Sequence, residues 1–359
     1  MMKPPLVWAA ALQKISDRAQ AVDIAGVWPR DNLCDLARCG AMRWSLPKIY
    51  GGQGLAPIQL HHRYAQLASA CLSTALILTQ RDAALEFLIC TPAGPSKRNA
   101  EKLLLKLASN RIFASIGIAQ LTTSGQHQQG GVTAIKDGQN WRVSGVIPWS
   151  TGADYSDFLI AGACAEQKDQ LLFILDMKKP GVRVCPAPCM AVLNATNTSA
   201  IELRNVLITA RDVLSGPCPN ALAIRNAYRR FSLNTCILPL GVAAGALQLA
   251  QELVKPRTPR CRAAISELCR RQRDLACQVY TLGADKVEAN SASRSANMRA
   301  QCNDLCFRCA ASCLELAKGR GLMMEHPAQR RLREAMFFFV WSSGSSVTEE
   351  TLASLSNVP

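Results

Sequence analysis

The sequence predicts an α+β protein with three regions in the order helices, strands, helices. Residues 1–112 contain long Ala/Leu/Gln-rich stretches of helical periodicity, whereas residues 113–217 break into short β-branched runs separated by Gly, Asp-Gly or Pro. Helical periodicity returns over residues 218–359. Strands that are grouped together, instead of alternating with helices, argue against a doubly wound nucleotide-binding fold. We therefore expect an N-terminal helical domain, a central antiparallel β domain and a C-terminal helical bundle.

Turn and breaker residues subdivide these regions. The paired glycines of LPKIYGGQGL (Leu46 to Leu55) predict a loop that interrupts the N-terminal helices. Asp137-Gly138 lies between two strand-like runs, TAIK and NWRVSG, and predicts a hairpin with a type I′ turn. Pro256 and Pro259 should break the helical pattern of the C-terminal region.

The chain has a formal net charge of +15, with arginine dense in its C-terminal third. Nucleic acid is one partner for such a charge, but no zinc-finger spacing, RNA-binding aromatic motif or basic tail accompanies it. A phosphorylated cofactor, coenzyme A or an acidic carrier protein would suit the charge equally well. We therefore expect no nucleic-acid partner.

Sixteen cysteines is a high count, and a disulfide framework must be considered. The length of the chain and its ordinary core composition argue against one. Cys302, Cys306, Cys309 and Cys313 recur at helical spacing, which puts all four on one face. They would span roughly 16 Å of helix, too far to ligate a single metal ion. With only four histidines in the chain, we expect no metal site and interpret these cysteines as small apolar core residues.

No run of about 18 uncharged apolar residues is present, so we expect no membrane-spanning helix. The N-terminal stretch MMKPPLVWAAALQKI has a short apolar segment without a cleavage site. We interpret it as an amphipathic first helix and expect a cytoplasmic protein.

Several segments, in one collinear order, are similar to those of a known family. These segments are GAMRWSLPKIYGGQGL, ASACLSTALILTQ, IAQLTTSGQH, KDGQNWRVSGVIPWSTGADYSDFLIAGA, TSAIELRNVLITARDVLSG, LAKGRGLMMEHPAQRRLREA and LREAMFFFVWSSGSSVTEE. Together they resemble the acyl-CoA dehydrogenase family over nearly the whole chain. The resemblance implies a β-barrel-like central domain and a C-terminal four-helix bundle.

The resemblance also implies a cofactor, FAD, held between the β domain and the C-terminal helices across a subunit interface. By position, Gln120, Leu121, Thr122 and Thr123 match the loop that faces the flavin. Trp149 matches the residue that stacks on the ring, and Ser150 and Thr151 match those that hydrogen-bond its edge. Arg257, Gly319 and Gly321 match positions that hold the neighbouring subunit's cofactor. Ser124 and Gln126 lie near the position that touches the substrate thioester or its phosphates.

The family's usual catalytic base is missing from this sequence. Arg333, Glu334 and Ala335 match the family's Arg-Asp-Ala helix, but the position of the glutamate base falls on Ser342. Some family members carry the base on an earlier helix, and there this chain reads Leu233, Asn234 and Thr235. A serine without a neighbouring base cannot remove a proton from carbon at neutral pH.

Other departures affect the cofactor segments. The flavin-facing loop reads Gln-Leu-Thr-Thr-Ser-Gly-Gln-His in place of an acidic Pro-Gly form, and Lys318 replaces the first glycine of Gly-Gly-x-Gly. Glu349 and Glu350 follow Ser342 by about two helical turns, roughly 10 Å away, which is too far to replace the base directly. Glu334 is expected to pair with an arginine.

Three functions follow from these observations. The first is an FAD-dependent oxidoreductase acting on an acyl-CoA or acyl-carrier-protein thioester, with altered base chemistry or a flavin-oxygen reaction. The second is a non-catalytic or cofactor-sharing subunit of a hetero-oligomer with a base-bearing paralogue. The third is a basic binding protein for nucleic acid or an acidic carrier. The resemblance further implies a homodimer or tetramer.

Overall fold

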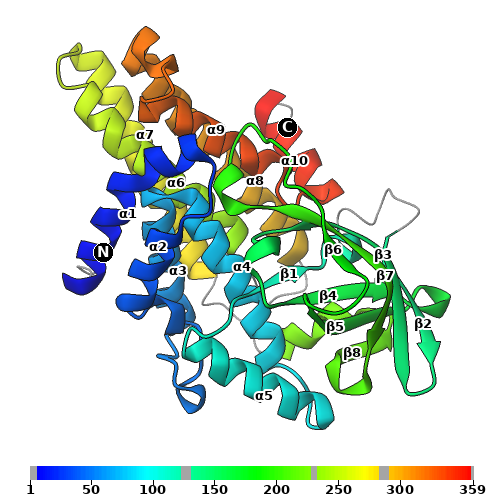
Figure 1. Ribbon diagram of the computed structural model, residues 1–359. Helices are drawn as coiled ribbons and strands as arrows, with labels where there is room; N and C mark the ends of the chain where they lie inside the picture. Colours follow the sequence, from blue (N-terminus) through cyan, green and yellow to red (C-terminus); the bar gives the residue numbers. More distant parts are fainter. Residues whose placement is uncertain (1–5, 123–130, 228–232, 283–290, 357–359) are drawn as a thin grey trace.

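The computed structural model describes residues 6–122, 131–227, 233–282 and 291–356. Figure 1 shows a helical half and a β half side by side, with helix α5 below them. The first group of helices is α1 (Leu6–Ala25), α2 (Arg30–Arg38), α3 (Pro57–Ala70), α4 (Leu72–Ile89) and α5 (Pro95–Ala108). The second group is α6 (Asn234–Leu253), α7 (Pro259–Leu282), α8 (Ser291–Ala317), α9 (Pro327–Val340) and α10 (Ser345–Ser356).

Between the two groups of helices in the sequence come the strands of an eight-stranded sheet. Seven of them follow the order β6-β7-β3-β2-β4-β5-β8, and β1 pairs with β4 off this path. Its strands are β1 (Ala114–Gly117), β2 (Thr133–Asp137), β3 (Asn140–Ser150), β4 (Phe158–Cys164), β5 (Gln170–Asp176), β6 (Val182–Val184), β7 (Ser199–Ile208) and β8 (Val213–Cys218). Most neighbouring strands are antiparallel, but β1 pairs with β4 in parallel. The expected order of helices, β region and helices is therefore confirmed, with two parallel pairs, β1 with β4 and β2 with β4, in the otherwise antiparallel sheet. The boundaries at residues 112 and 217 stay a prediction.

Helix α6 is the centre of the helical half. It packs against α3, α7, α8 and α9, and most of its side chains from Cys236 to Ala250 are buried. It is the one helix in the described parts of the chain that is long and apolar enough to span a membrane. Because 67% of that apolar window is buried inside the protein, α6 is the core helix of the bundle.

The cysteines expected to share a helical face do so on α8. Cys302, Cys306, Cys309 and Cys313 are each 0% exposed and join the core shared by α3, α6 and α9. All sixteen cysteines are free thiols. The described residues contain no cluster of His, Cys, Asp and Glu that could hold a metal ion.

The breakers act as expected, with one correction. Helix α6 ends at Leu253 and α7 begins at Pro259, so the two prolines separate these helices. Asp137 pairs with Asn140 across the predicted hairpin between β2 and β3. Of its two turn residues only Gly138 has positive φ (60°), so the predicted type I′ turn, which needs two, is wrong.

Two glycines let α6 approach α3 closely. A Cβ atom on Gly241 would lie 2.4 Å from the carbonyl oxygen of Ala65, and one on Gly245 would lie 2.4 Å from that of Ser69. Both contacts are with backbone, which cannot move aside without separating the helices. Alanine at either position would therefore force the two helical groups apart.

We predict that Gly241→Ala lowers the free energy of unfolding by about 1–2 kcal/mol, because overpacking outweighs the better helix propensity of alanine. Chemical denaturation with a helical signal measures this change. Gln248→Ala, at an exposed position of the same helix, is the control and should leave stability almost unchanged. Equal stability of wild type and Gly241→Ala would contradict the close packing of α3 and α6.

Candidate flavin site and base position

Trp149 is presented at the surface by an irregularity in strand β3. The register of β3 with β7 shifts between Ile147 and Ser150, and Pro148 within this bulge has no N–H to donate. A bulge of this kind re-aims a side chain out of the regular alternation. The Trp149 side chain is 50% exposed, whereas Ile147 and Ser150 on either side are buried. An open indole at this point can stack against a flat ring, which fits the role expected of it.

The two hydroxyls that follow Trp149 are turned into the protein. Ser150 Oγ donates to the carbonyl oxygen of Ile116 (3.2 Å). Thr151 Oγ1 lies 3.2 Å from Thr198 Oγ1. Thr198 Oγ1 in turn lies 2.8 Å from Thr196 Oγ1, and Thr196 donates to the carbonyl oxygen of Leu193.

Each hydroxyl has one proton, so the donor and acceptor in each of these hydrogen bonds follow from the last bond, which ends on the carbonyl oxygen of Leu193. Thr196 donates to a carbonyl, and Thr198 must then donate to Thr196 and Thr151 to Thr198. Ser150 and Thr151 therefore keep only lone pairs for a ligand. They can accept from a ring N–H but cannot donate to a ring nitrogen or carbonyl.

The loop that is expected to face the flavin packs next to strand β3, which carries Trp149, and is held there by hydrogen bonds. Gln120 is buried, and its Nε2 donates to the carbonyl oxygens of Gly117 (2.9 Å) and Gly162 (2.7 Å). Leu121 lies over Gly162, where an added Cβ would be 2.2 Å from the leucine Cδ1. Thr122 is exposed and donates to the carbonyl oxygen of Ala119. The other expected loop and substrate residues, Thr123, Ser124 and Gln126, lie outside the described residues.

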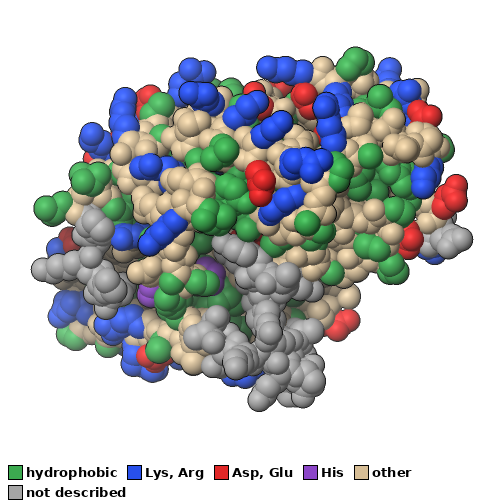
Figure 2. Space-filling model, turned by 90° about the horizontal axis from the view of Figure 1, so that it is seen from below, with side chains coloured by type: hydrophobic (Ala, Val, Ile, Leu, Met, Phe, Trp, Pro, Cys, Tyr) green, Lys and Arg blue, Asp and Glu red, His purple; other side chains and the backbone are tan. Residues whose placement is uncertain are grey.

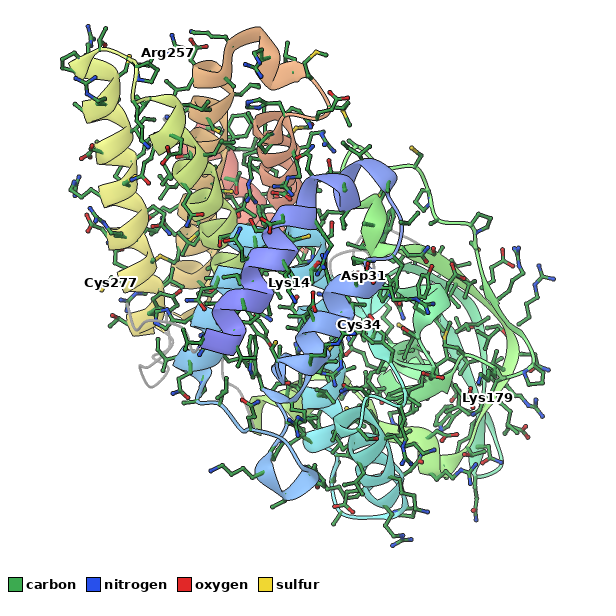
Figure 3. All side chains as sticks on the ribbon, turned by 60° about the vertical axis from the view of Figure 1, so that its left-hand side comes forward. Lys14, Asp31, Cys34, Lys179, Arg257 and Cys277 are labelled. Carbon is green, nitrogen blue, oxygen red and sulfur yellow. The ribbon has the colours of Figure 1, made fainter. Side chains whose placement is uncertain are left out.

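Arg257 and Gly319 both lie near the end of α8, in the helical half of the molecule. The Arg257 guanidinium donates to the carbonyl oxygen of Leu316 (3.1 Å) near the end of α8. Nothing lies within 4 Å of a Cβ added at Gly319, whereas Gly321 is packed against Leu314 and Ala317. Figure 3 shows Arg257 at the end of the helical half and Lys179 on the β half at the opposite side. One chain therefore does not bring all the expected cofactor residues together.

Ser342 lies in a left-handed turn after the end of α9. Its φ is 51°, its side chain is exposed, and its carbonyl oxygen accepts a hydrogen bond from Arg299 Nη1 (2.7 Å). Glu349 is exposed on α10, and Glu350 accepts a hydrogen bond from Asn297. No carboxylate thus stands at Ser342 in this part of the described chain.

Arg299 is the residue of this site that sequence reasoning missed. It is 7% exposed, and besides Ser342 it donates to the carbonyl oxygen of Trp341 and lies 3.4 Å from Ser343 Oγ. Its Nε has no partner, and within the described residues no carboxylate pairs with it. Burial lowers the pKa of the Arg299 guanidinium. Carbonyl oxygens at the C-terminus of α9 give this cation a partial negative charge to face.

A pair of thiols adjoins Arg299. A hydrogen bond from Cys302, and then the positive charge of Arg299, lower the pKa of Cys236, which begins the buried part of α6. Burial raises the pKa of Cys302 well above its usual value. Within the described residues, the predicted base positions at Ser342 and near Thr235 therefore both lie close to the Arg299 guanidinium, and no carboxylate pairs with it. No motif marks Arg299, because helical periodicity alone makes it an ordinary polar residue of α8.

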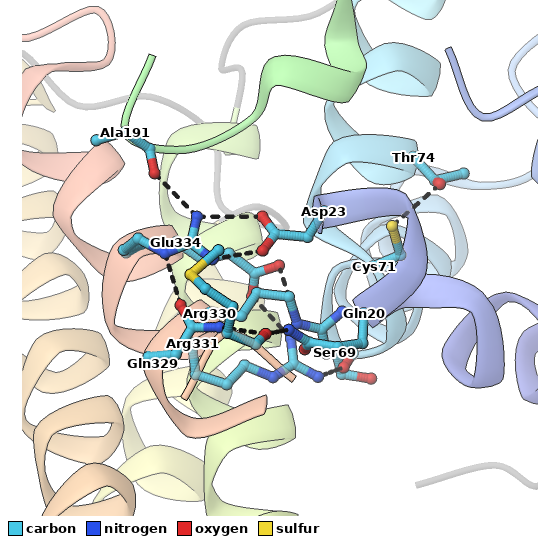
Figure 4. Close-up of polar contacts among 12 residues, drawn as sticks. Gln20, Asp23, Ser69, Cys71, Thr74, Ala191, Gln329, Arg330, Arg331 and Glu334 are labelled. Atoms are coloured by element: carbon cyan, nitrogen blue, oxygen red, sulfur yellow. Dashed lines mark hydrogen bonds and ion pairs between the residues drawn. The ribbon is translucent and has the colours of Figure 1, made fainter. Parts of the chain in front are cut away.

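Glu334 has the structural role expected for it. Its carboxylate pairs with Arg331 (2.9 Å) and lies 4.0 Å from Arg330, and all three side chains are buried. Figure 4 shows these residues beside Ser69 of α3, with Arg333 reaching Asp23 of α1. The carboxylate is thus enclosed by arginines and cannot act on a substrate.

No family model matches the chain. Curated relatives match it over most of its length at low identity. The probable acyl-CoA dehydrogenase YngJ of Bacillus subtilis is 22% identical over 364 residues, covering 96% of this chain and 94% of the relative. The 3-sulfinopropanoyl-CoA desulfinase of Paraburkholderia xenovorans is 21% identical, covering 96% and 92%.

Among solved structures, butyryl-CoA dehydrogenase of Megasphaera elsdenii superimposes with a TM-score of 0.80 at 17% identity, covering 99% of this chain and 100% of that one. This likeness confirms the fold, including the arrangement of helices around a central β region. The resemblance to the acyl-CoA dehydrogenases is confirmed by the relatives and the fold together.

We predict that Ser342→Gly raises the free energy of unfolding by about 0.5–1 kcal/mol, because glycine tolerates the left-handed backbone that strains serine. Ser345→Gly, at a nearby exposed position without positive φ, should lower stability instead. Thermal unfolding of the two variants measures both changes. A loss of stability in Ser342→Gly would show that the turn is not left-handed.

Proposed function

We propose that this chain, whose relatives along nearly its whole length are acyl-CoA dehydrogenases, is an FAD-dependent oxidoreductase acting on an acyl thioester with altered base chemistry. Trp149 is the observation that carries the cofactor part of the proposal, because a half-exposed indole at a β bulge suits stacking on a flavin. The acyl-CoA relatives support a thioester of coenzyme A or of a carrier protein as the substrate. The cytoplasm is the proposed location.

Different residues of this chain would contact different parts of FAD. Trp149 would cover one face of the ring, and the Ser150 and Thr151 oxygens would accept from an N–H at its edge. The loop from Gln120 to Thr123 would border the ring. Bound FAD would supply the acceptor for two electrons. Arg257 and Gly319 would come from a second copy in a homodimer or tetramer, since Arg257 lies at an end of the helical half, whereas Trp149 belongs to strand β3 of the β half.

Proton removal is the step that this chain is least equipped to perform. Among the described residues no group that could accept a proton lies beside Ser342, and the charged group next to its turn is the Arg299 cation. A buried cation stabilises a nearby anion and does not accept a proton. Ser124 and Gln126 would bind the substrate, but they do not supply the missing base.

The absence of a base at Ser342 also favours a second candidate function. A chain that keeps the fold and lacks a base suits a non-catalytic or cofactor-sharing subunit of a hetero-oligomer. A base-bearing paralogue would then supply proton removal. Activity of the isolated chain, compared with activity in the presence of the paralogue, distinguishes the two functions.

We predict that the purified chain binds about one FAD and that Trp149→Ala weakens FAD binding at least about tenfold through loss of stacking. Flavin absorbance and fluorescence titration measure the binding. Ile135→Ala, which removes another exposed apolar side chain from the β region, should bind FAD as the wild type does. No flavin binding by wild type, even after reconstitution, would refute the cofactor proposal.

We predict that Ser342→Glu increases the rate of flavin reduction by an acyl-CoA about 100-fold or more, since general bases typically contribute that much. Stopped-flow bleaching of the flavin measures the rate. Ser345→Glu adds the same charge at an exposed position of α10 and should give no increase. If Ser342→Glu binds FAD and the acyl-CoA but gains nothing, the missing base is not what limits this chain.

A further inference from the structure

The outer side of helix α5 carries a row of cations. Arg98, Lys102 and Lys106 recur every four residues and are all exposed, so they follow one side of the helix at a spacing of roughly 6 Å. Among the described residues no carboxylate forms an ion pair with any of the three. Glu101, the one acidic residue of α5, accepts a hydrogen bond from the Tyr50 hydroxyl (3.2 Å).

The opposite side of α5 fixes this orientation. Ala100, Leu104 and Leu107 are each 0% exposed and lie in the core shared with α4 and the sheet. Lys97 donates to the carbonyl oxygen of Ile89 and is committed to that contact (2.9 Å). The helix therefore cannot rotate to hide the basic row.

Two exposed aliphatic side chains lie on α5 and on the short helix next to it. Leu105 of α5 is 55% exposed, and Ile49 is 81% exposed in the short helix Lys48–Tyr50. That short helix lies alongside α5, because Tyr50 bonds to Glu101.

We call the set Lys48, Ile49, Arg98, Lys102, Leu105 and Lys106 the α5 face. Figure 2 views the molecule from below, the side where α5 lies in Figure 1, and shows many more basic than acidic side chains there.

We propose that the α5 face docks on an anionic lipid surface. A row of unpaired lysines and arginine complements lipid phosphates, and each basic residue near such a surface adds to the attraction. Exposed leucine and isoleucine suit the boundary between headgroups and acyl chains. Single-stranded nucleic acid is typically bound by aromatic side chains that stack on bases, and base edges are often read by neutral amides; the α5 face has neither kind of side chain.

This inference is independent of the proposed function, because the α5 face contains no residue assigned to the flavin or the base. It also accounts for part of the net charge of +15. The docking is peripheral, since the helix leaves its apolar side in the protein core.

Sedimentation of the full chain with phosphatidylcholine vesicles, with and without phosphatidylglycerol, tests the proposal. We expect binding only to the anionic vesicles, with an affinity that falls as salt is raised. Combined Arg98→Glu, Lys102→Glu and Lys106→Glu substitution should weaken binding by about 100-fold or more. Leu105→Ser alone should weaken it several-fold.

A matched control separates this surface from the overall charge. Arg260→Glu, Arg273→Glu and Lys178→Glu, at exposed positions outside the α5 face, make the same change in net charge and should reduce binding far less. Equal losses in the two triple variants, no binding by the folded wild type, or equal binding to neutral vesicles would each overturn the proposal. If the triple Glu variant does not fold, Gln at the same three positions provides the test.

Discussion

The buried charges of helix α9 are the constraint on which the arrangement of the helical half depends. Arg331 pairs with Glu334 and donates to the carbonyl oxygen of Ser69 on α3, in the space left by Gly245 of α6. Arg333 pairs with Asp23 of α1 and donates to the carbonyl oxygen of Ala191 (2.9 Å) in the segment between β6 and β7. Removing one partner of a buried pair typically costs about 3–5 kcal/mol, because the other charge is left unpaired.

This network also determines where the turn after α9 can lie. With α9 joined to α1, α3 and the β half, the chain leaves the helix at Trp341 in one position. Arg299 of α8 then holds the carbonyl oxygens of Trp341 and Ser342. A helix bound at both ends presents residue 342 in the same geometry whichever side chain stands there. The backbone of the turn at the predicted base position is thus held independently of the side chain at residue 342.

The fold could be predicted from the sequence because its signals are local. Pro256 and Pro259 separate two helices through a missing N–H, and the spacing of Cys302, Cys306, Cys309 and Cys313 is a property of one helix. The site was harder to predict, because its contacts join distant segments. Arg299 meets residues more than 40 positions away, and the protons of Ser150 and Thr151 are directed by Ile116 of strand β1 and by Thr198 just before β7. A match to a family pattern can place a residue in a site, but it does not show whether that residue donates or accepts hydrogen bonds there.

The cysteines of the core determine how this protein becomes irreversibly inactivated. Six buried cysteines, Cys71, Cys236 and the four of α8, are shielded from oxidants while the helices stay packed. An opened chain adds them to the ten remaining thiols, and random disulfides would then block refolding. In an oxidising solution the lifetime of the protein is therefore set by how often it opens and not by its equilibrium stability.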